Sequence, residues 1–231
     1  MDNRFYFSEI NGEFVTFKEQ ECIHISRVMR KQVGDNIVGF NGDGLDYNLQ
    51  ISNITKSTVT AKILSKSKNR AMDEINITVY LAMLKNDALA DAIDILAELN
   101  VRQVKLFKAD FSVANVDEKK LNKLTLNSIV ASKQCERADV MQISIISKKA
   151  MEEEIKKTKN CFFAYENSNE KIASFNGDFS VIIGPEGGFS NTEAETYSKL
   201  ATPISLGKTI LRAPVACATA VSSLKAVNNA R

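Results

Sequence analysis

The sequence predicts an α/β protein in two parts, a small β-barrel over residues 1–70 and a mostly parallel sheet with helices over residues 71–231. Short runs of alternating apolar and polar residues fill the first part, which is typical of half-buried strands. In the second part, apolar strands alternate with segments of helical period, which indicates a parallel sheet covered by helices. With 231 residues, 44% of them hydrophobic and 25% charged, the chain can bury a core in each part.

The strands of the first part follow from its alternating runs. They are predicted at Ile37–Phe40, Tyr47–Ile54 and Thr58–Leu64, and Asn41-Gly42 is a strong signal for a hairpin between the first two. A polar junction then separates the two parts. The basic residues that lead into it are Lys62, Lys66, Lys68 and Arg70.

Strands and helices are expected to alternate along the second part. The predicted order is strand Ile77–Met83, a helix from Asp87, strand Val101–Phe107, a helix within 117–136, strand Val140–Ile146, a helix near 148–158, and strands at Cys161–Tyr165 and Val181–Ile183. Asp87 is predicted to cap its helix, and Asn100 to end that helix in the left-handed conformation. Pro214 suits the first position of a last helix, over Val215–Val227, that is crowded with small residues.

The most informative motif is the heptad Gly184-Pro185-Glu186-Gly187-Gly188-Phe189-Ser190, which directly follows the strand Val181–Ile183. Glycines lack the Cβ atoms that would hold a ligand away from the main chain. Ser190 and Glu193 have the spacing of a capping box, so a helix is predicted to follow at once. A second glycine-bearing segment, Leu206–Arg212, comes soon afterwards. The two segments predict one ligand site, and neither a Walker loop nor a Rossmann fingerprint is present.

The two glycine segments resemble those of the RsmE group of SPOUT methyltransferases, which methylate N3 of a uridine in small-subunit ribosomal RNA. The resemblance runs nearly from end to end. The other matching positions are Arg4–Phe7, His24–Arg30, Phe40–Gly44, Lys85, Asp87, Glu98-Leu99, Gln134 and Arg137. The resemblance implies a SPOUT-type parallel sheet with a C-terminal trefoil knot, preceded by a PUA-like β-barrel.

The resemblance also implies a cofactor, a substrate and the residues that contact them. The cofactor would be S-adenosylmethionine, the substrate 16S ribosomal RNA of the small ribosomal subunit, and the protein a homodimer. The expected cofactor contacts are Ile183, Gly184, Pro185, Glu186, Gly187, Gly188, Leu206, Gly207, Ile210 and Leu211. Glu186 would either hold a ribose hydroxyl or brace its own turn. Arg212 is the catalytic candidate, because a cation beside the carbonyl oxygens of uracil would stabilise the anion formed when N3 loses its hydrogen.

RNA contacts are expected chiefly from the barrel, with two from the second part. The candidates are Arg4, His24, Arg27, Arg30, Lys85 and Arg137. If the segment that begins at His24 is helical, positions 24, 27, 30 and 31 share one face that could grip phosphates. An ordinary solvated polar face is the alternative.

Composition excludes several classes of protein. His24 is the only histidine, so multi-histidine metal centres are excluded and no metal is expected. Four scattered cysteines predict reduced, buried thiols rather than disulfides or a zinc site. No apolar stretch is long enough for a membrane span and no signal peptide is recognised, so the protein is expected in the cytoplasm. The formal net charge is only +2, so any RNA site must be a local patch.

The chain departs from the family pattern at the rim of the expected cofactor site. Ala213-Pro214-Val215-Ala216 stands where the family usually has Thr-Glu-Thr-Ala, which removes a hydroxyl and a carboxylate. Further departures are Asp94–Asn100, Lys133-Gln134-Cys135 and Tyr165-Glu166. Two alternatives therefore stay open: a non-catalytic RNA-binding or ribosome-assembly factor of the same fold, and a methyltransferase for another RNA nucleotide.

Overall fold

The computed structural model describes residues 4–229, which divide into two compact units. The first unit contains the chain up to Met72 together with Ile129–Val140, and the second contains Asp73–Ser128 and the chain from Met141 onward. Helix α3 (Glu118–Gln134) therefore begins among the residues of the second unit and ends among those of the first. The return of Ile129–Val140 to the first unit was not part of the predicted division.

The first unit is built on one six-stranded sheet that curves around its own core. Its spatial order is β1 (Arg4–Tyr6), β4 (Asn36–Phe40), β5 (Leu45–Ile54), β6 (Thr58–Lys68), β3 (Phe14–Lys18) and β2 (Ile10–Asn11). Only the β1–β4 pair is parallel. The rings of Phe5 on β1 and Phe17 on β3 meet with centroids 6.2 Å apart, although the two strands are separated in the sheet order. The predicted small β-barrel is thereby confirmed.

The hairpin between β4 and β5 is formed as the Asn41-Gly42 signal predicted. Gly42 and Gly44 have φ angles of 97° and 84°, a conformation that residues with a Cβ rarely adopt. Asn41 Oδ1 accepts from the Asp43 amide, and Asp43 Oδ1 accepts from the Leu45 amide, so side chains complete the turn.

The helical stripe predicted from His24 to Lys31 is wrong in its geometry. Helix α1 (Glu19–Ile23) passes into a π-helical turn, His24–Val28, in which the Met29 amide bonds to the His24 carbonyl at 2.8 Å. Arg30 then adopts a left-handed conformation, with φ of 53°. The wider turn and the early end of the helix carry Arg30 off the face that His24 and Arg27 would share.

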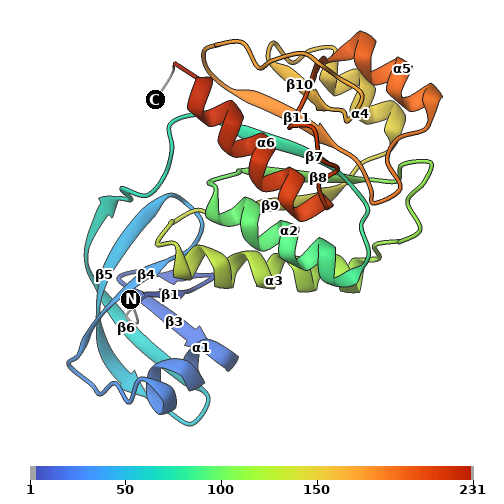
Figure 1. Ribbon diagram of the computed structural model, residues 1–231. Coiled ribbons are helices and arrows are strands. Elements are labelled where there is room, and N and C mark those ends of the chain that lie inside the picture. The colour runs from blue at the N-terminus through green and yellow to red at the C-terminus, as the bar shows by residue number, and fades with distance from the viewer. Residues whose placement is uncertain (1–3, 230–231) are drawn as a thin grey trace. The chain divides into compact units, whose positions relative to one another are not determined.

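The second unit contains a six-stranded sheet in which every pair of neighbours is parallel. Its spatial order is β12 (Thr202–Ile204), β10 (Cys161–Ala164), β11 (Phe179–Ile183), β7 (Ile77–Ala82), β8 (Gln103–Phe107) and β9 (Gln142–Ile145). Helices α2 (Asn86–Glu98) and α6 (Ala213–Val227) cover one face, and α4 (Lys148–Ile155) and α5 (Asn191–Leu200) cover the other (Figure 1). The predicted α/β architecture is confirmed.

The central strands β7 and β11 are buried on both faces, which explains their nearly continuous apolar sequences, whereas the edge strand β9 is largely exposed. Tyr80 and Ile182 belong to the cluster that receives Met151 of α4 and Tyr197 of α5. Val79, which points to the opposite face because side chains alternate along a strand, is also fully buried.

Helix boundaries differ from the predictions by one to three residues. Lys85 is the N-cap of α2, so Asp87 lies inside its first turn rather than capping it. Asn100 has the predicted left-handed conformation, with φ of 64°. Arg212 is the N-cap of α6, which places Pro214 at the second helical position rather than the first. Both hydrogen bonds of the predicted capping box between Ser190 and Glu193 are present.

The four cysteines are free thiols. Cys22, Cys161 and Cys217 are buried, as predicted, but Cys135 is only half-buried. Burial raises the pKa of Cys161 to about 11 and that of Cys217 to about 12, so both thiols stay protonated at neutral pH.

None of the helices described between residues 4 and 229 combines the length and the apolar character that a membrane span requires.

Candidate active site

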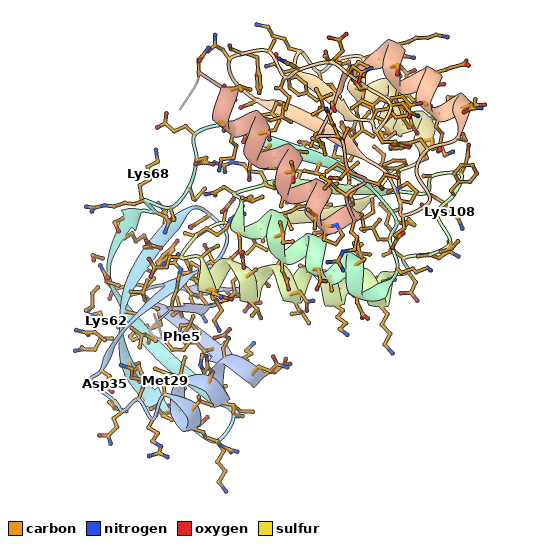
Figure 2. All side chains as sticks on the ribbon, in the orientation of Figure 1. Phe5, Met29, Asp35, Lys62, Lys68 and Lys108 are labelled. Carbon is orange, nitrogen blue, oxygen red and sulfur yellow. The ribbon has the colours of Figure 1, made fainter. Side chains whose placement is uncertain are left out.

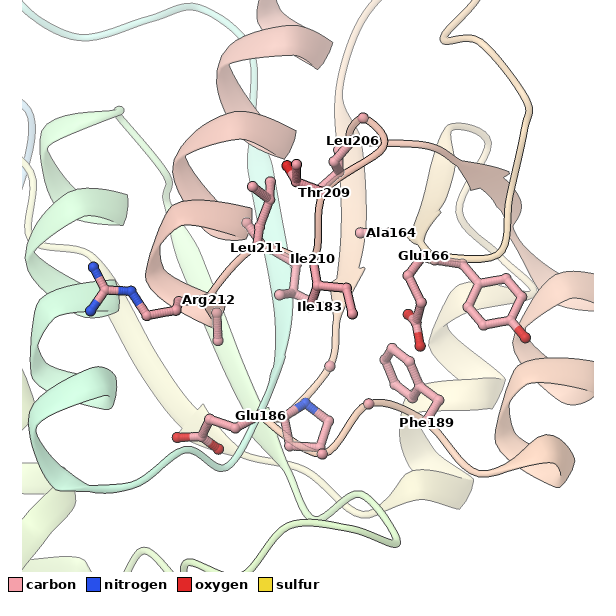
Figure 3. Close-up of a pocket in the computed structure, with 18 residues that line it drawn as sticks. Ala164, Glu166, Ile183, Glu186, Phe189, Leu206, Thr209, Ile210, Leu211 and Arg212 are labelled. Atoms are coloured by element: carbon pink, nitrogen blue, oxygen red, sulfur yellow. The ribbon is translucent and has the colours of Figure 1, made fainter.

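A cavity of about 370 Å³ lies where β10, β11 and β12 end (Figure 3). Parallel strands deliver their carboxyl ends to one edge of the sheet, so the loops that follow them meet there. The lining residues are Ala164, Tyr165, Glu166, Ile183, Gly184, Pro185, Glu186, Gly187, Gly188, Phe189, Leu206, Gly207, Thr209, Ile210, Leu211, Arg212, Ala213 and Ala216. The structure thus brings together all ten residues predicted to contact a cofactor, with Arg212 beside them.

The glycines of the first segment are required by the space around them. A Cβ atom at Gly184 would lie 2.6 Å from the ring of Phe189, which is far closer than any normal contact. Gly188 has φ of 71°, and a Cβ there would lie 3.2 Å from Glu166 Oε1. The Gly188 amide bonds back to the Pro185 carbonyl at 3.0 Å, which closes the turn. At Gly184, Gly187 and Gly188 the cavity is therefore lined by main chain alone, between residues that contribute side chains.

Phe189 joins the cavity wall to the core beneath it. Its ring meets Phe163 on β10 at 4.9 Å and Tyr197 on α5 at 5.6 Å, both edge-on. Phe163 and Tyr197 belong to the buried cluster of the second unit, so Phe189 connects the cavity wall to a close-packed core.

A cluster of charges fixes the start of α5, the helix that follows the first glycine segment. Lys148 Nζ pairs with Glu193 Oε1 at 2.7 Å and also pairs with Asp110. Asp110 accepts a further hydrogen bond from Ser190 Oγ and donates its amide to Glu193 Oε1 at 2.9 Å. The loop after β8, the start of α4 and the start of α5 are thereby held to one another.

Glu186 braces a neighbouring helix. Its Oε1 accepts a hydrogen bond of 3.1 Å from the amide of Lys85, the N-cap of α2. A carboxylate at a helix N-terminus is stabilised by the exposed amides and by the helix dipole. The structure therefore shows a bracing contact to α2, which neither of the two roles predicted for Glu186 included.

The second glycine segment forms the opposite wall. Gly207 has φ of 123°, which only glycine adopts readily, and its amide lies 3.4 Å from Ser205 Oγ. Leu206 and Leu211 are half-buried, whereas Ile210 is 91% exposed. An isoleucine this exposed at the edge of a cavity is available to cover a ligand.

Arg212 is exposed at the point where the second segment enters α6. Among residues 4–229, its guanidinium has no hydrogen-bond or ion-pair partner. Figure 3 shows the side chain extending away from the other lining residues. Arg212 is thus free to pair with a group brought by a substrate, and its catalytic role stays a prediction.

Sequence reasoning missed part of the cavity. Glu166 and Tyr165 follow β10, and Figure 3 shows the Glu166 carboxylate across from Ile183 and next to Phe189. Strand Cys161–Tyr165 was predicted to belong to the same parallel sheet, so the segment after it could have been assigned to the same edge. Ala164 and Thr209 were not predicted either, whereas Ala213 and Ala216 lie at the rim as expected and Phe189 belongs to the predicted heptad.

Two candidates for RNA contact in the first unit are already engaged. Arg4 pairs with Asp46 at 2.6 Å, its guanidinium lies over the Phe40 ring, and only 10% of its side chain is exposed. The His24 ring packs edge-on against Phe5 at 5.4 Å. Both residues support the barrel core in this structure.

Other candidates divide by exposure. Arg27 and Arg30 are exposed in the first unit, and Lys85 is exposed in the second. Arg137 is 1% exposed and forms a two-pronged pair with Asp139, with both bonds at 2.7 Å. A buried, paired guanidinium has no open face for a phosphate, so we do not retain Arg137 as an RNA contact.

Strand β6 adds exposed basic side chains that were not among the predicted contacts. Figure 2 shows Lys62 and Lys68 at the outside of this strand. Lys66, between them, lies over the ring of Tyr47 at 4.9 Å.

Within the described residues, no three His, Cys, Asp or Glu side chains are grouped so that they could bind a metal ion.

Comparison with known proteins identifies related sequences and structures. Residues 71–225 match the RNA methyltransferase domain, and residues 6–64 match the RNA methyltransferase PUA domain. The ribosomal RNA small subunit methyltransferase E of Rickettsia conorii is 28% identical over 96% of this chain and 95% of its own. That of Bacillus subtilis is 28% identical over 89% and 87%. The crystal structure of the Neisseria gonorrhoeae enzyme of the same name, bound to S-adenosylmethionine, superposes with a TM-score of 0.86 over 98% of each chain, at 22% identity.

Proposed function

The chain belongs to the RNA methyltransferase family, and from this premise we propose that it transfers the methyl group of S-adenosylmethionine to 16S ribosomal RNA of the small ribosomal subunit. The observation that carries the proposal is the single cavity formed by both glycine-bearing segments at the carboxyl edge of the parallel sheet. Relatives named for methylation of small-subunit ribosomal RNA match nearly the whole chain, barrel included.

The cavity suits S-adenosylmethionine in size and chemistry. A volume of about 370 Å³ lies within the range of small-molecule sites. We propose that the adenine and ribose lie against the main chain of Gly184–Gly188, with Ile183, Leu206 and Leu211 as apolar contacts. The Glu166 carboxylate would face the ribose hydroxyls or the positive charge of the cofactor. S-adenosylmethionine supplies a methyl group already activated by its sulfonium, so the protein has to bind, align and manage one proton.

We propose N3 of a uridine as the methylated atom and Arg212 as the residue that assists the reaction. The free guanidinium of Arg212 is a cation at the rim of the cavity that could stabilise the uracil anion formed when N3 loses its hydrogen. Exposed Arg27 and Arg30 in the first unit, and Lys85 in the second, would hold the phosphates of the RNA. The target base would have to leave its stack to reach the cofactor, at a cost of a few kcal/mol.

One observation favours a second candidate, a non-catalytic RNA-binding or assembly factor. Ala213 and Ala216 line the cavity, and with Pro214 they supply no side-chain group that could accept a proton where α6 begins. A protein that had lost methyl transfer could keep the same fold and the same RNA contacts. Methylation of another nucleotide would leave the cofactor site unchanged.

Two measurements separate these functions. Titration calorimetry with S-adenosylmethionine should show binding in the micromolar range, and its absence would rule out the enzyme. Nucleoside mass spectrometry of 16S RNA from a strain that lacks the gene should show that 3-methyluridine has disappeared. If 3-methyluridine stays at the parental level while another methylated nucleoside is lost, the enzyme is right and the base is wrong.

We further propose a cytoplasmic homodimer with a C-terminal trefoil knot. Ile210, which precedes α6, and Val215, in the first turn of α6, are exposed apolar residues that support a second copy of the chain against this region. The loop between β10 and β11 is tied to the C-terminal segment, because Phe175 exchanges backbone hydrogen bonds with Val227 and Asn229. Light scattering should give the mass of a dimer, and a monomer at micromolar concentration would contradict the pairing.

A further inference from the structure

Phe111 is a half-exposed aromatic side chain beside the first glycine segment. It follows β8 along the chain, and 51% of its surface is exposed. A Cβ atom built at Gly187 would lie 3.1 Å from the Phe111 Cβ, so the two residues are in contact at the edge of the cavity that Gly187 lines. In the part of the chain that the structure describes, the Phe111 ring meets no other aromatic ring, whereas Phe107 packs against Tyr197 at 6.2 Å.

A tight turn presents this ring to solvent. The Ser112 amide bonds to the Ala109 carbonyl at 3.0 Å, and the Ala109 amide bonds to Ser112 Oγ at 3.2 Å. Ala109 and Ser112 are both buried, so the turn is anchored at its base while Phe111 stands at its tip. Exposing a phenylalanine sacrifices the stabilisation that burial of its ring would give.

The turn is also fixed relative to the cavity. Asp110 accepts hydrogen bonds from Lys148 and from Ser190 Oγ, and its amide donates to Glu193 at 2.9 Å. Ser190 closes the glycine heptad and caps α5. Phe111 is therefore held in place through Asp110 by the element that forms the cavity wall.

Exposed cations accompany the ring. Lys108 precedes the turn, and its ammonium group bonds only to the neutral Asn115 side chain among the described residues. Lys85 is exposed at the start of α2, and its amide donates to Glu186, the residue that precedes Gly187 in the glycine segment. An exposed aromatic ring, together with cations that form no ion pair among the described residues, is the chemistry by which proteins hold single-stranded nucleic acid, with bases on the ring and phosphates on the cations.

We propose that Phe111 is a stacking platform for an unpaired base of the RNA substrate at the edge of the cavity. This inference rests on the proposed function, because it presumes an RNA substrate. The ring would position the strand and increase RNA affinity, and because every base has a π-face it would carry little sequence preference. Phe111 is thus a positioning residue and takes no part in methyl transfer.

The chain contains no tryptophan, which gives a direct test. Phe111→Trp in the full-length protein installs a single tryptophan, whose emission can be excited apart from that of the five tyrosines, and decauridylate should cause a saturable loss of its fluorescence. An abasic oligonucleotide of equal length should not, because it offers phosphates without bases. Val113→Trp, at a residue 74% exposed in the same loop, is the matched control and should be quenched much less. Equal quenching at both positions, or none at position 111, would overturn the inference.

Kinetics and mass provide the second readout. Phe111→Leu keeps an apolar side chain but removes the π-face, so KM for small ribosomal subunits should rise about 5- to 150-fold. The affinity of Phe111→Leu for S-adenosylmethionine should not change. Phe111→Tyr, which keeps an aromatic ring, should have the KM of the wild type. An unchanged KM in Phe111→Leu would refute stacking. A lower oligomeric mass of Phe111→Leu than of the wild type would also refute it, because the ring would then form contacts between copies of the chain. If the wild type itself fails to bind S-adenosylmethionine, the proposed function fails, and the quenching experiment still decides whether Phe111 stacks on bases.

Discussion

In the proposed reaction, Arg212 is the residue that stabilises the uracil anion. Replacing it with alanine should lower kcat by about 10²- to 10³-fold, as the loss of one stabilising group in a transition state does. Affinity for S-adenosylmethionine should change little, because Arg212 contributes to the start of α6 through its carbonyl, which accepts from the Ala216 amide at 2.9 Å and survives in alanine. Titration calorimetry and single-turnover methylation measure the two quantities.

The control for Arg212→Ala is Lys208→Ala, which removes an exposed cation from the same segment and should leave turnover nearly unchanged. Parallel losses of turnover and of cofactor affinity in Arg212→Ala would instead assign the guanidinium to cofactor binding.

Gly184 tests whether the close packing of the cavity wall is required. The alanine Cβ would lie 2.6 Å from the Phe189 ring, so Gly184→Ala should destabilise the fold by about 1–3 kcal/mol and weaken cofactor binding. Phe189→Leu removes the ring that the new methyl group meets. The double variant should therefore be more stable than the sum of the single effects predicts, as measured by urea denaturation. Strict additivity would show that the ring moves aside at no cost.

At the scale of elements, the charge cluster at the start of α5 predicts a pH dependence. Hydrogen bonds from Lys148 and then from Ser190 hold the pKa of Asp110 below its usual value. Burial alone would lower the pKa of Lys148, but hydrogen bonds to Asp110 and Glu193 outweigh it and raise the pKa. Because the pKa of the carboxyl is lowered by folding, its ionised form stabilises the fold above about pH 4, and this stabilisation is lost in acid. Because the pKa of the ammonium group is raised by folding, its charged form stabilises the fold below about pH 10, and this stabilisation is lost in alkali.

The difference in Tm between the wild type and Lys148→Met should therefore be largest near neutral pH and should narrow toward both extremes. Lys149→Met, at the exposed neighbouring position, should show a small difference that does not vary in this way. A Tm difference for Lys148→Met that stayed constant from acid to alkali would mean that packing of its aliphatic chain, and not its charge, stabilises the cluster.

The elements also show how far sequence could predict the structure. Strand and helix order followed from apolar periodicity, and the capping box at Ser190 followed from spacing alone, because both are local properties. The contact from Glu186 to the Lys85 amide joins residues 101 positions apart, and nothing local announces it. The π-helical turn at His24, whose ring packs on the distant Phe5, was likewise not indicated by the local sequence. Arg137 was expected at the surface because charge alone does not reveal a buried partner such as Asp139.

At the scale of the whole molecule, the first unit is assembled from two separate stretches of chain. Asn69 Nδ2 donates to the Glu136 carbonyl at 2.8 Å, and the Gly44 amide donates to the Ala138 carbonyl at 3.3 Å. Lys133, also from the second stretch, forms an ion pair of 2.6 Å with the carboxylate of a residue in α1. The first unit therefore includes residues beyond the polar junction near residue 70, namely Ile129–Val140.

A fragment of residues 1–72 should accordingly be much less stable than the barrel within the full chain. Net contributions of about 0.5–1.5 kcal/mol for each lost hydrogen bond are a large share of the 3–5 kcal/mol that a core of this size supplies. Joining Ile129–Val140 to the fragment through a flexible Gly-Ser linker should restore a cooperative urea transition, because the missing partners return at high effective concentration. The same linker carrying a scrambled copy of that segment is the control. If the bare fragment unfolds as cooperatively as the linked one, and at the same urea concentration, then residues 129–140 contribute nothing to the stability of the barrel.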